Sequence, residues 1–359
     1  MSLEATMTAR RLPVDAAAPP ETVGGSRHDM SERATDGVGS DDACSESEED
    51  RLAVDHETQS VGSAFRDWVE LTKPRIVAMI LVTTVASAWI AMGNQWLPIG
   101  MGPLGWLWLL VGTGLVAGSA GAANQIWETD VDQFMPRTAS RPIPAERIPI
   151  RTAMLATGWA LLMGLWILKL RFGVAPALVG LATWLLYVLV YTPMKTRTAW
   201  NTTVGAIAGA MPVFIGYTAA GGSLSELAGW MLFGLLAFWQ YPHFMAIAWL
   251  YRRQYGQAGF QMTTTIDPTG RHAGWQSMVG SVCLILCGLV TCVMPHGDTI
   301  FSTASFLASF LVIAAGVPLV LAAWRFSRDP VDQKARKMLR WSLLVLPAVL
   351  LVMTLRVAL

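Results

Sequence analysis

The sequence predicts an all-α polytopic membrane protein, with about nine transmembrane helices around a central cavity that opens to cytoplasmic loops. Hydrophobic residues make up 53% of the 359 positions and charged residues only 14%, whereas soluble domains carry about 25% charged residues. Apolar runs recur along the chain, and a spanning helix needs about 20 apolar residues. Basic residues fall in alternate loops between these runs. Together these observations exclude a water-soluble enzyme core.

Residues 1–62 are predicted to be a disordered acidic tail. They carry 14 acidic and 5 basic side chains and show no hydrophobic period. Such a segment cannot bury enough apolar surface to offset the entropy of ordering, and a solvated extension explains it better than a partner-binding arm. The second domain, residues 63–359, holds the apolar runs. The four cysteines form no Cys-x-x-Cys pair, so neither a disulfide framework nor a zinc site is indicated.

Nine charge-free runs are the candidate transmembrane helices. Uninterrupted runs favour helices over barrel strands, in which apolar and polar residues alternate. Gly205, Gly209 and Gly216 in the fifth run suit close helix contact. The runs cover residues 76–92, 104–124, 152–168, 172–194, 198–220, 227–251, 273–294, 299–324 and 341–355.

The basic residues set the expected orientation. When loops are numbered alternately, 18 of the 21 basic residues beyond the tail fall on the amino-terminal side. Lys and Arg accumulate in cytoplasmic loops. We therefore expect a multi-pass protein of the cell (inner) membrane, with the amino terminus and the basic loops in the cytoplasm and the carboxyl terminus on the opposite side.

The most informative segment lies at the end of the second run. Asn124, Glu128 and Asp132 recur at i, i+4 and i+8, which places them on one helix face because each step of four drifts by only about 40°. Two carboxylates and an amide oxygen on one face can hold Mg²⁺, which prefers oxygen ligands and also binds substrate phosphates. These three residues are the predicted metal ligands, whereas Asp130 points elsewhere.

An arginine loop follows this face. Arg137 and Arg141 lie in a segment bounded by prolines, and guanidinium groups match phosphate oxygens bidentately. A metal face followed by such a loop suits a diphosphate. The alternative is a polar helix end whose arginines anchor to lipid headgroups or pair with the acids. The catalytic candidates are Asn124, Glu128, Asp132 and Arg137.

Two further segments contribute candidates. Basic residues follow the fourth and sixth runs, although cytoplasmic loops are expected to be basic in any case. Inside the sixth run His243 is a candidate ligand contact or proton shuttle, because intramembrane polar groups are costly and often functional. A buried histidine bonded to a neighbouring helix is an equal alternative. The diphosphate-binding candidates are Arg137, Arg141, Lys195, Arg197 and Arg252.

Several stretches resemble one known family. Residues 124–142 read Asn-Gln-x-x-Glu-x-x-x-Asp-x-x-Met-x-Arg-Thr-x-x-Arg-Pro, which resembles the first motif of intramembrane aromatic prenyltransferases. Leu-Thr-Lys-Pro-Arg-Ile over residues 71–76 is similar to that family's start of the first helix, and residues 191–212 to its central signature. Trp-Gln-x-Pro-His-Phe over residues 239–244 resembles the branch that farnesylates haem B. The likeness spans roughly residues 66–359.

The resemblance implies both the activity and its reactants. In that branch, the farnesyl group of farnesyl diphosphate is transferred to the vinyl group of haem B (protohaem IX). Water adds, and haem O and diphosphate form, for use by haem-copper terminal oxidases. The implied cofactor is Mg²⁺. The implied partners are both substrates, the lipid bilayer and haem A synthase or terminal oxidase assembly, with no nucleic acid. Positions implied to contact haem or prenyl are Tyr191, Asn201, Gln240, His243 and Tyr255.

One position departs from the family pattern. An acidic residue usually precedes the tyrosine that corresponds to Tyr255, but here the residue is Gln254. An amide is a poorer Mg²⁺ ligand than a carboxylate. Asp267, further along the same loop, is an alternative metal ligand, or else an ordinary Asp-Pro turn residue. A second metal position therefore stays open.

Two other classes of protein fit part of the sequence. A related prenyltransferase acting on a quinone or chlorophyll precursor would have the same helices and metal face, but the Pro-His-Phe context of residues 242–244 argues against it. A membrane transporter would use intramembrane polar groups without a metal and diphosphate face. The triad of Asn124, Glu128 and Asp132 beside two arginines argues against a transporter.

Overall fold

Long apolar helices make up most of the computed structural model, which describes residues 63–93, 101–294 and 302–358. Within these residues nine helices are long and apolar enough to cross a membrane, and no strand is found. A bilayer core offers no water to backbone groups, so helices that satisfy their own N–H and C=O groups are stable there. The predicted fold class is confirmed. The predicted acidic tail lies outside the described residues.

Most of the nine spans are single helices, and two are assembled from pieces. The single helices are α2 (Pro74–Met92), α3 (Pro103–Trp127), α5 (Ile150–Phe172), α10 (Leu227–Leu250), α13 (Arg271–Val293), α14 (Thr303–Arg328) and α15 (Asp332–Ala358). The fourth span joins α6 (Val174–Leu185), η1 (Leu186–Tyr191) and α7 (Thr192–Met194), and the fifth joins α8 (Asn201–Ala210) and α9 (Pro212–Ala219). The short helices α4 (Thr129–Asp132), α11 (Arg252–Gln257) and α12 (Thr263–Ile266) lie between spans.

A proline explains the break in the fifth span, and a π-helical turn interrupts the fourth. Pro212 ends α8 and begins α9, because proline has no N–H for the helical bond and clashes with the preceding turn. Element η1 is a π-helical turn, a form that is rare and often found at functional sites. Thr192 stabilises it by donating its hydroxyl to the Tyr187 carbonyl at 2.9 Å.

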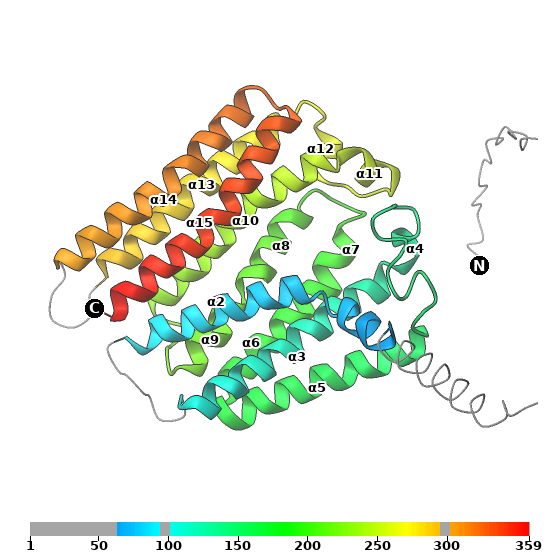
Figure 1. Ribbon diagram of the computed structural model, residues 1–359, viewed down its shortest axis with the longest axis horizontal. Coiled ribbons are helices and arrows are strands. Elements are labelled where there is room, and N and C mark those ends of the chain that lie inside the picture. Colours follow the sequence, from blue (N-terminus) through cyan, green and yellow to red (C-terminus); the bar gives the residue numbers. More distant parts are fainter. Residues whose placement is uncertain (1–62, 94–100, 295–301, 359) are drawn as a thin grey trace, which may run out of the picture. The chain divides into compact units, whose positions relative to one another are not determined.

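The helices surround a cavity. α2 packs against α3 and α9, α10 packs against α8, α13 and α15, and α15 also meets α2. Figure 1 shows the short helices α4, α7, α11 and α12 gathered at the end where α3 and α10 finish and α2 begins. The cavity between α2, α3, η1, α8 and α10 has a volume of about 540 Å³. We call the end of the bundle that carries these short helices the polar end.

Glycines let these helices approach closely. A Cβ on Gly216 would lie 2.0 Å from the Thr84 carbonyl oxygen, so α9 and α2 meet backbone to backbone at this point. Gly205 leaves room for the Tyr191 ring and Gly209 for the Gln240 amide. The expectation that these glycines allow close contact is confirmed, and two of them make room for side chains that line the cavity.

The α2–α9 contact gives a stability prediction. Gly216→Ala should destabilise the protein by about 1–3 kcal/mol, because the added methyl meets a helix backbone that cannot rotate away. The matched control is Gly158→Ala on α5, where a Cβ meets nothing within 4 Å. Thermal unfolding in detergent should show a lower midpoint for the first variant and an unchanged or higher one for the control. Equal midpoints would contradict the close contact.

Candidate active site

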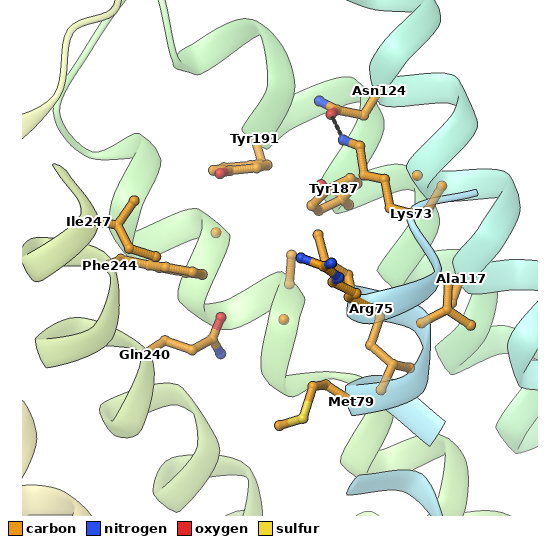
Figure 2. Close-up of a pocket in the computed structure, with 18 of the residues that line it drawn as sticks. Lys73, Arg75, Met79, Ala117, Asn124, Tyr187, Tyr191, Gln240, Phe244 and Ile247 are labelled. Atoms are coloured by element: carbon orange, nitrogen blue, oxygen red, sulfur yellow. Dashed lines mark hydrogen bonds between the residues drawn. The ribbon is translucent and has the colours of Figure 1, made fainter. Parts of the chain in front are cut away.

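The cavity has a strongly basic polar end and an apolar interior. Charged residues in its lining are Lys73, Arg75, Arg137, Arg141, Lys195, Glu128 and Asp132, which is five basic against two acidic groups. Deeper walls carry apolar side chains such as Met79, Phe244 and Ile247 (Figure 2). Its volume falls within the range of about 300–1,000 Å³ that is typical of small-molecule pockets. The arrangement suits a ligand with an anionic head and a hydrophobic body.

The predicted metal face lines this cavity, but not as one continuous helix. α3 ends at Trp127, Glu128 is its C-cap with φ −90° and ψ 4°, and α4 begins at the next residue. Despite this break, Asn124, Glu128 and Asp132 all line the cavity and all are buried. The three residues therefore meet at one cavity. However, the prediction that they share one continuous helix was wrong, because the helix is interrupted at Glu128.

Each member of this face has a cationic partner from elsewhere in the chain. Lys195 Nζ lies 2.6 Å from Glu128 Oε1, Arg141 pairs with Asp132 Oδ2, and Lys73 donates to Asn124 Oδ1. Asn124 also donates to the Thr192 hydroxyl at 3.0 Å. Buried carboxylates are strongly destabilising without such partners.

Burial and pairing set the pKa values at this end of the cavity. Burial opposes ionisation of Glu128, yet Lys195 and Lys73 hold the pKa of its carboxyl below the ordinary value. For Asp132 burial prevails over the Arg141 guanidinium and raises the pKa. Burial also lowers the pKa of Lys73 to about 7, against the attraction of Glu128.

Lys73 is held in an unusual backbone conformation. Its φ of 57° and ψ of 62° lie in the left-handed region, which is uncommon for residues other than glycine. Gln125 fixes the preceding turn by donating its amide to the carbonyls of Glu70 and Leu71, at 3.2 and 3.0 Å. Gly121 allows the approach, because a Cβ there would meet the Thr72 carbonyl at 2.9 Å. In this conformation the Lys73 ammonium donates to Asn124 Oδ1 (Figure 2).

The arginine loop reaches α11 across the polar end. The Arg137 guanidinium lies over the rings of Tyr251 and Tyr255, 4.7 and 5.6 Å from their centroids. It also donates to the Tyr255 hydroxyl at 3.2 Å. Arg137 and Tyr255 thus close the loop after α4 onto α11, and both line the cavity.

The segment after η1 is pinned to the loop before α12. Lys195 Nζ sits 4.7 Å from the centroid of the Tyr191 ring, and the Lys195 carbonyl accepts from the Gln261 N–H at 2.7 Å. Asn201 donates its side-chain amide to the Gln261 carbonyl at 2.9 Å. Tyr191, Lys195 and Asn201 all line the cavity.

Two predicted residues reach the cavity from α10. Gln240 is buried and donates to the Ala206 carbonyl at 2.9 Å. His243 stacks on Trp239 and places Nδ1 3.0 Å from the Ser342 hydroxyl. Both of these residues line the cavity.

Three predicted residues are turned away from the lining. Arg197 is exposed in the loop after α7. Arg252 pairs with Asp332 at 2.9 Å and covers the Trp249 ring. Asp267 accepts from the backbone N–H groups of residues 269 and 272, as an Asp at a turn does. Among the described residues, the cavity lining includes none of these three, and Gln254 is absent from it as well.

Sequence reasoning missed several cavity residues. Lys73, Arg75, Tyr187, Thr192 and Phe244 all line or bound the site. The signals were present: Lys73 and Arg75 flank the proline that opens α2, Tyr187 lies four residues before Tyr191, and Phe244 follows His243. Those signals marked positions in the chain but gave no direction for the side chains.

The fold and the cavity define a class of membrane protein with an internal site for an anionic and hydrophobic ligand, and comparisons with known proteins identify its family. Residues 79–344 match the UbiA prenyltransferase family. The chain belongs to the UbiA prenyltransferase family.

Two curated relatives of this chain share the same name. The chain is 64% identical to the protoheme IX farnesyltransferase of Rhodopirellula baltica over 81% of this chain and 100% of that protein. It is 38% identical to the protoheme IX farnesyltransferase of Solibacter usitatus over 79% of this chain and 96% of that protein.

Solved structures share the fold. A UbiA homologue from Archaeoglobus fulgidus bound to GPP and Mg²⁺ superposes with a TM-score of 0.58 at 15% identity, over 80% of this chain and 99% of that chain. A UbiA homologue from Aeropyrum pernix K1 gives a TM-score of 0.57 at 15% identity, over 76% of this chain and 97% of that chain. At this identity the likeness speaks for the fold alone.

The pKa of Lys73 predicts a pH effect on stability. The folded protein loses this proton near pH 7 and the unfolded chain near its ordinary value of 10.5. Between these values the unfolded state binds more protons, so the stability contributed by this group rises with pH. Melting temperatures of wild type and Lys73→Gln, measured from pH 6 to 9, should diverge, with wild type gaining above about pH 7. Parallel curves would contradict the lowered pKa.

Proposed function

We propose that the chain is a protohaem IX farnesyltransferase, which transfers the farnesyl group of farnesyl diphosphate to the vinyl group of haem B. Water adds in the same reaction, and the products are haem O and diphosphate. The observation that carries this conclusion is the 64% identity to the Rhodopirellula relative along that protein's full length. The shared name of the Rhodopirellula and Solibacter relatives favours haem over a quinone or chlorophyll precursor as acceptor. Haem O then serves terminal oxidases, directly or through haem A synthase.

The acidic face suits Mg²⁺. Asp132 Oδ1 is buried without a hydrogen-bond partner among the described residues, and the second carboxylate and amide oxygen come from Glu128 and Asn124. Within the described part of the chain no three acidic, histidine or cysteine side chains form a complete metal cluster. Two carboxylates and one amide oxygen fit Mg²⁺, which binds through one or two carboxylates and completes its shell with waters and substrate phosphates. When bound, Mg²⁺ would neutralise charge on the leaving diphosphate.

The basic side chains perform the binding step. Lys195, Arg141 and Lys73 already surround the carboxylates, and Arg75 and Arg137 complete the cationic end. Five basic side chains against two acidic ones leave an excess of basic groups that suits a diphosphate. Hydrogen bonds from these groups stabilise the charge that develops on the leaving oxygen as the C1–O bond of the substrate breaks.

The deeper walls protect the carbon centre once the diphosphate leaves. Breaking the C1–O bond gives an allylic cation, and the vinyl carbon of haem B attacks C1. Water then captures the cation on the haem side and releases a proton. The apolar and aromatic side chains of Tyr187, Tyr191 and Phe244 keep bulk water from the farnesyl cation. Aromatic faces also attract a cation electrostatically.

Asp132 gives the sharpest test of this site. Asp132→Ala should lower haem O formation by about a hundredfold or more, because it removes the buried carboxylate that carries the free oxygen. Asp130→Ala is the matched control: this aspartate lies on the same short helix and is absent from the cavity lining. Haem O is measured by chromatography of membrane extracts, with insertion checked by membrane fractionation. Wild-type yield from inserted Asp132→Ala would remove the acidic face from the mechanism.

We also propose a location and an orientation for this multi-pass protein. It belongs to the cell (inner) membrane, with residues 1–62 and the polar end in the cytoplasm and the carboxyl terminus outside. The distribution of basic residues supports this, because 18 of 21 beyond the tail lie in loops on the amino-terminal side.

Protease accessibility tests the orientation. Residues 1–62 should be cleaved in inverted membrane vesicles and protected in intact spheroplasts. A tag placed after Leu359 should show the reverse pattern and serves as the internal control. Cleavage of the tail from the outside of spheroplasts would overturn the orientation.

A further inference from the structure

His243 presents a ring nitrogen whose state is fixed by a second helix. Its Nδ1 lies 3.0 Å from the hydroxyl oxygen of Ser342 on α15. That hydroxyl donates its hydrogen to the Leu339 carbonyl at 2.7 Å. A serine hydroxyl has only one hydrogen to give, so the Ser342 oxygen must accept from Nδ1–H. The neutral imidazole therefore carries its proton on Nδ1 and a lone pair on Nε2.

The ring is also fixed in orientation. The Trp239 indole stacks on it with centroids 4.9 Å apart and planes 22° from parallel. Trp239 Nε1 donates to the Ser342 backbone carbonyl at 2.6 Å, and Ser342 is fully buried. One residue of α15 thus holds both rings, so the imidazole can neither flip nor exchange tautomers without breaking a buried hydrogen bond.

Among the described residues, no hydrogen bond joins Nε2 of His243 to a protein partner. His243 lines the cavity, and no other described residue forms a hydrogen bond with its ring besides Ser342. An acceptor left unpaired in an apolar setting is unfavourable. Metal-ligating histidines have this arrangement, in which one ring nitrogen donates to an oxygen and thereby orients the other towards the metal.

We propose that Nε2 of His243 donates its electron pair to the iron of the porphyrin substrate. This bond fixes the porphyrin at one depth in the cavity. The inference rests on the proposed function, which supplies an iron porphyrin, and histidine is a common axial ligand of haem iron. The bond is dative: no proton leaves, and no electron is transferred to or from the iron. A purely structural histidine would only link α10 to α15.

The test compares haem B with iron-free protoporphyrin IX, which differs only at the metal. Full-length protein in detergent should bind ferric haem B more tightly than protoporphyrin IX and give the spectrum of imidazole-bound iron. His243→Ala should lose both the preference and the spectrum while protoporphyrin affinity is kept, and added free imidazole should restore the spectrum. His243→Phe, which keeps an aromatic ring against Trp239, should behave like His243→Ala and covers the case in which that variant misfolds.

Two further variants sharpen the test. Ser342→Ala leaves the imidazole but removes the acceptor for Nδ1–H, and it should weaken haem B binding by about ten- to a hundredfold with little change for protoporphyrin IX. His272→Ala removes an exposed histidine that is absent from the cavity lining and should change neither affinity.

The outcomes separate this inference from the proposed function. If His243→Phe and His243→Ala keep the iron spectrum and the preference for haem B, the ligation is overturned, while haem O formation by wild type still supports farnesyl transfer. If wild type neither binds haem B nor forms haem O, both the proposed function and the ligation are overturned.

Discussion

Two buried carboxylates, Glu128 at the end of α3 and Asp132 at the end of α4, require cationic partners, and this requirement connects distant parts of the chain. Glu128 takes Lys195 from beyond α7, and Asp132 takes Arg141 from the loop after α4. Lys73, the residue before α2, donates a hydrogen bond to Asn124. Removing one partner of such a pair leaves a charge in a low-dielectric setting, which costs about 3–5 kcal/mol. The polar end of the cavity is therefore part of what holds the helices in place.

The membrane explains why the remaining helix contacts are so close. Between helices in lipid there is no hydrophobic driving force, so association depends on packing and on small residues. Gly216 brings α9 against α2, and Gly164 brings α5 against the Gly112 carbonyl. The same device shapes the cavity, because Gly205 and Gly209 make room for Tyr191 and Gln240. Packing and site construction thus depend on the same kind of residue.

The cavity joins two environments that the proposed reaction needs together. Its polar end concentrates positive charge beside two acids, whereas its interior offers apolar and aromatic walls with one oriented imidazole on α10. Helix termini supply the first environment and helix interiors the second.

The sequence by itself determined the spans and the composition of the acidic face. Apolar length and charge are local properties, so nine spans could be read directly, and the spacing of Asn124, Glu128 and Asp132 identified one site. Only the tertiary structure decided which partners these groups meet and which way the basic residues turn. Lys73 enters the site while Arg252 turns to Asp332. The direction of each of these two side chains depends on a partner 51 or 80 positions away in the chain. The spacing of neighbouring residues cannot predict contacts across that separation.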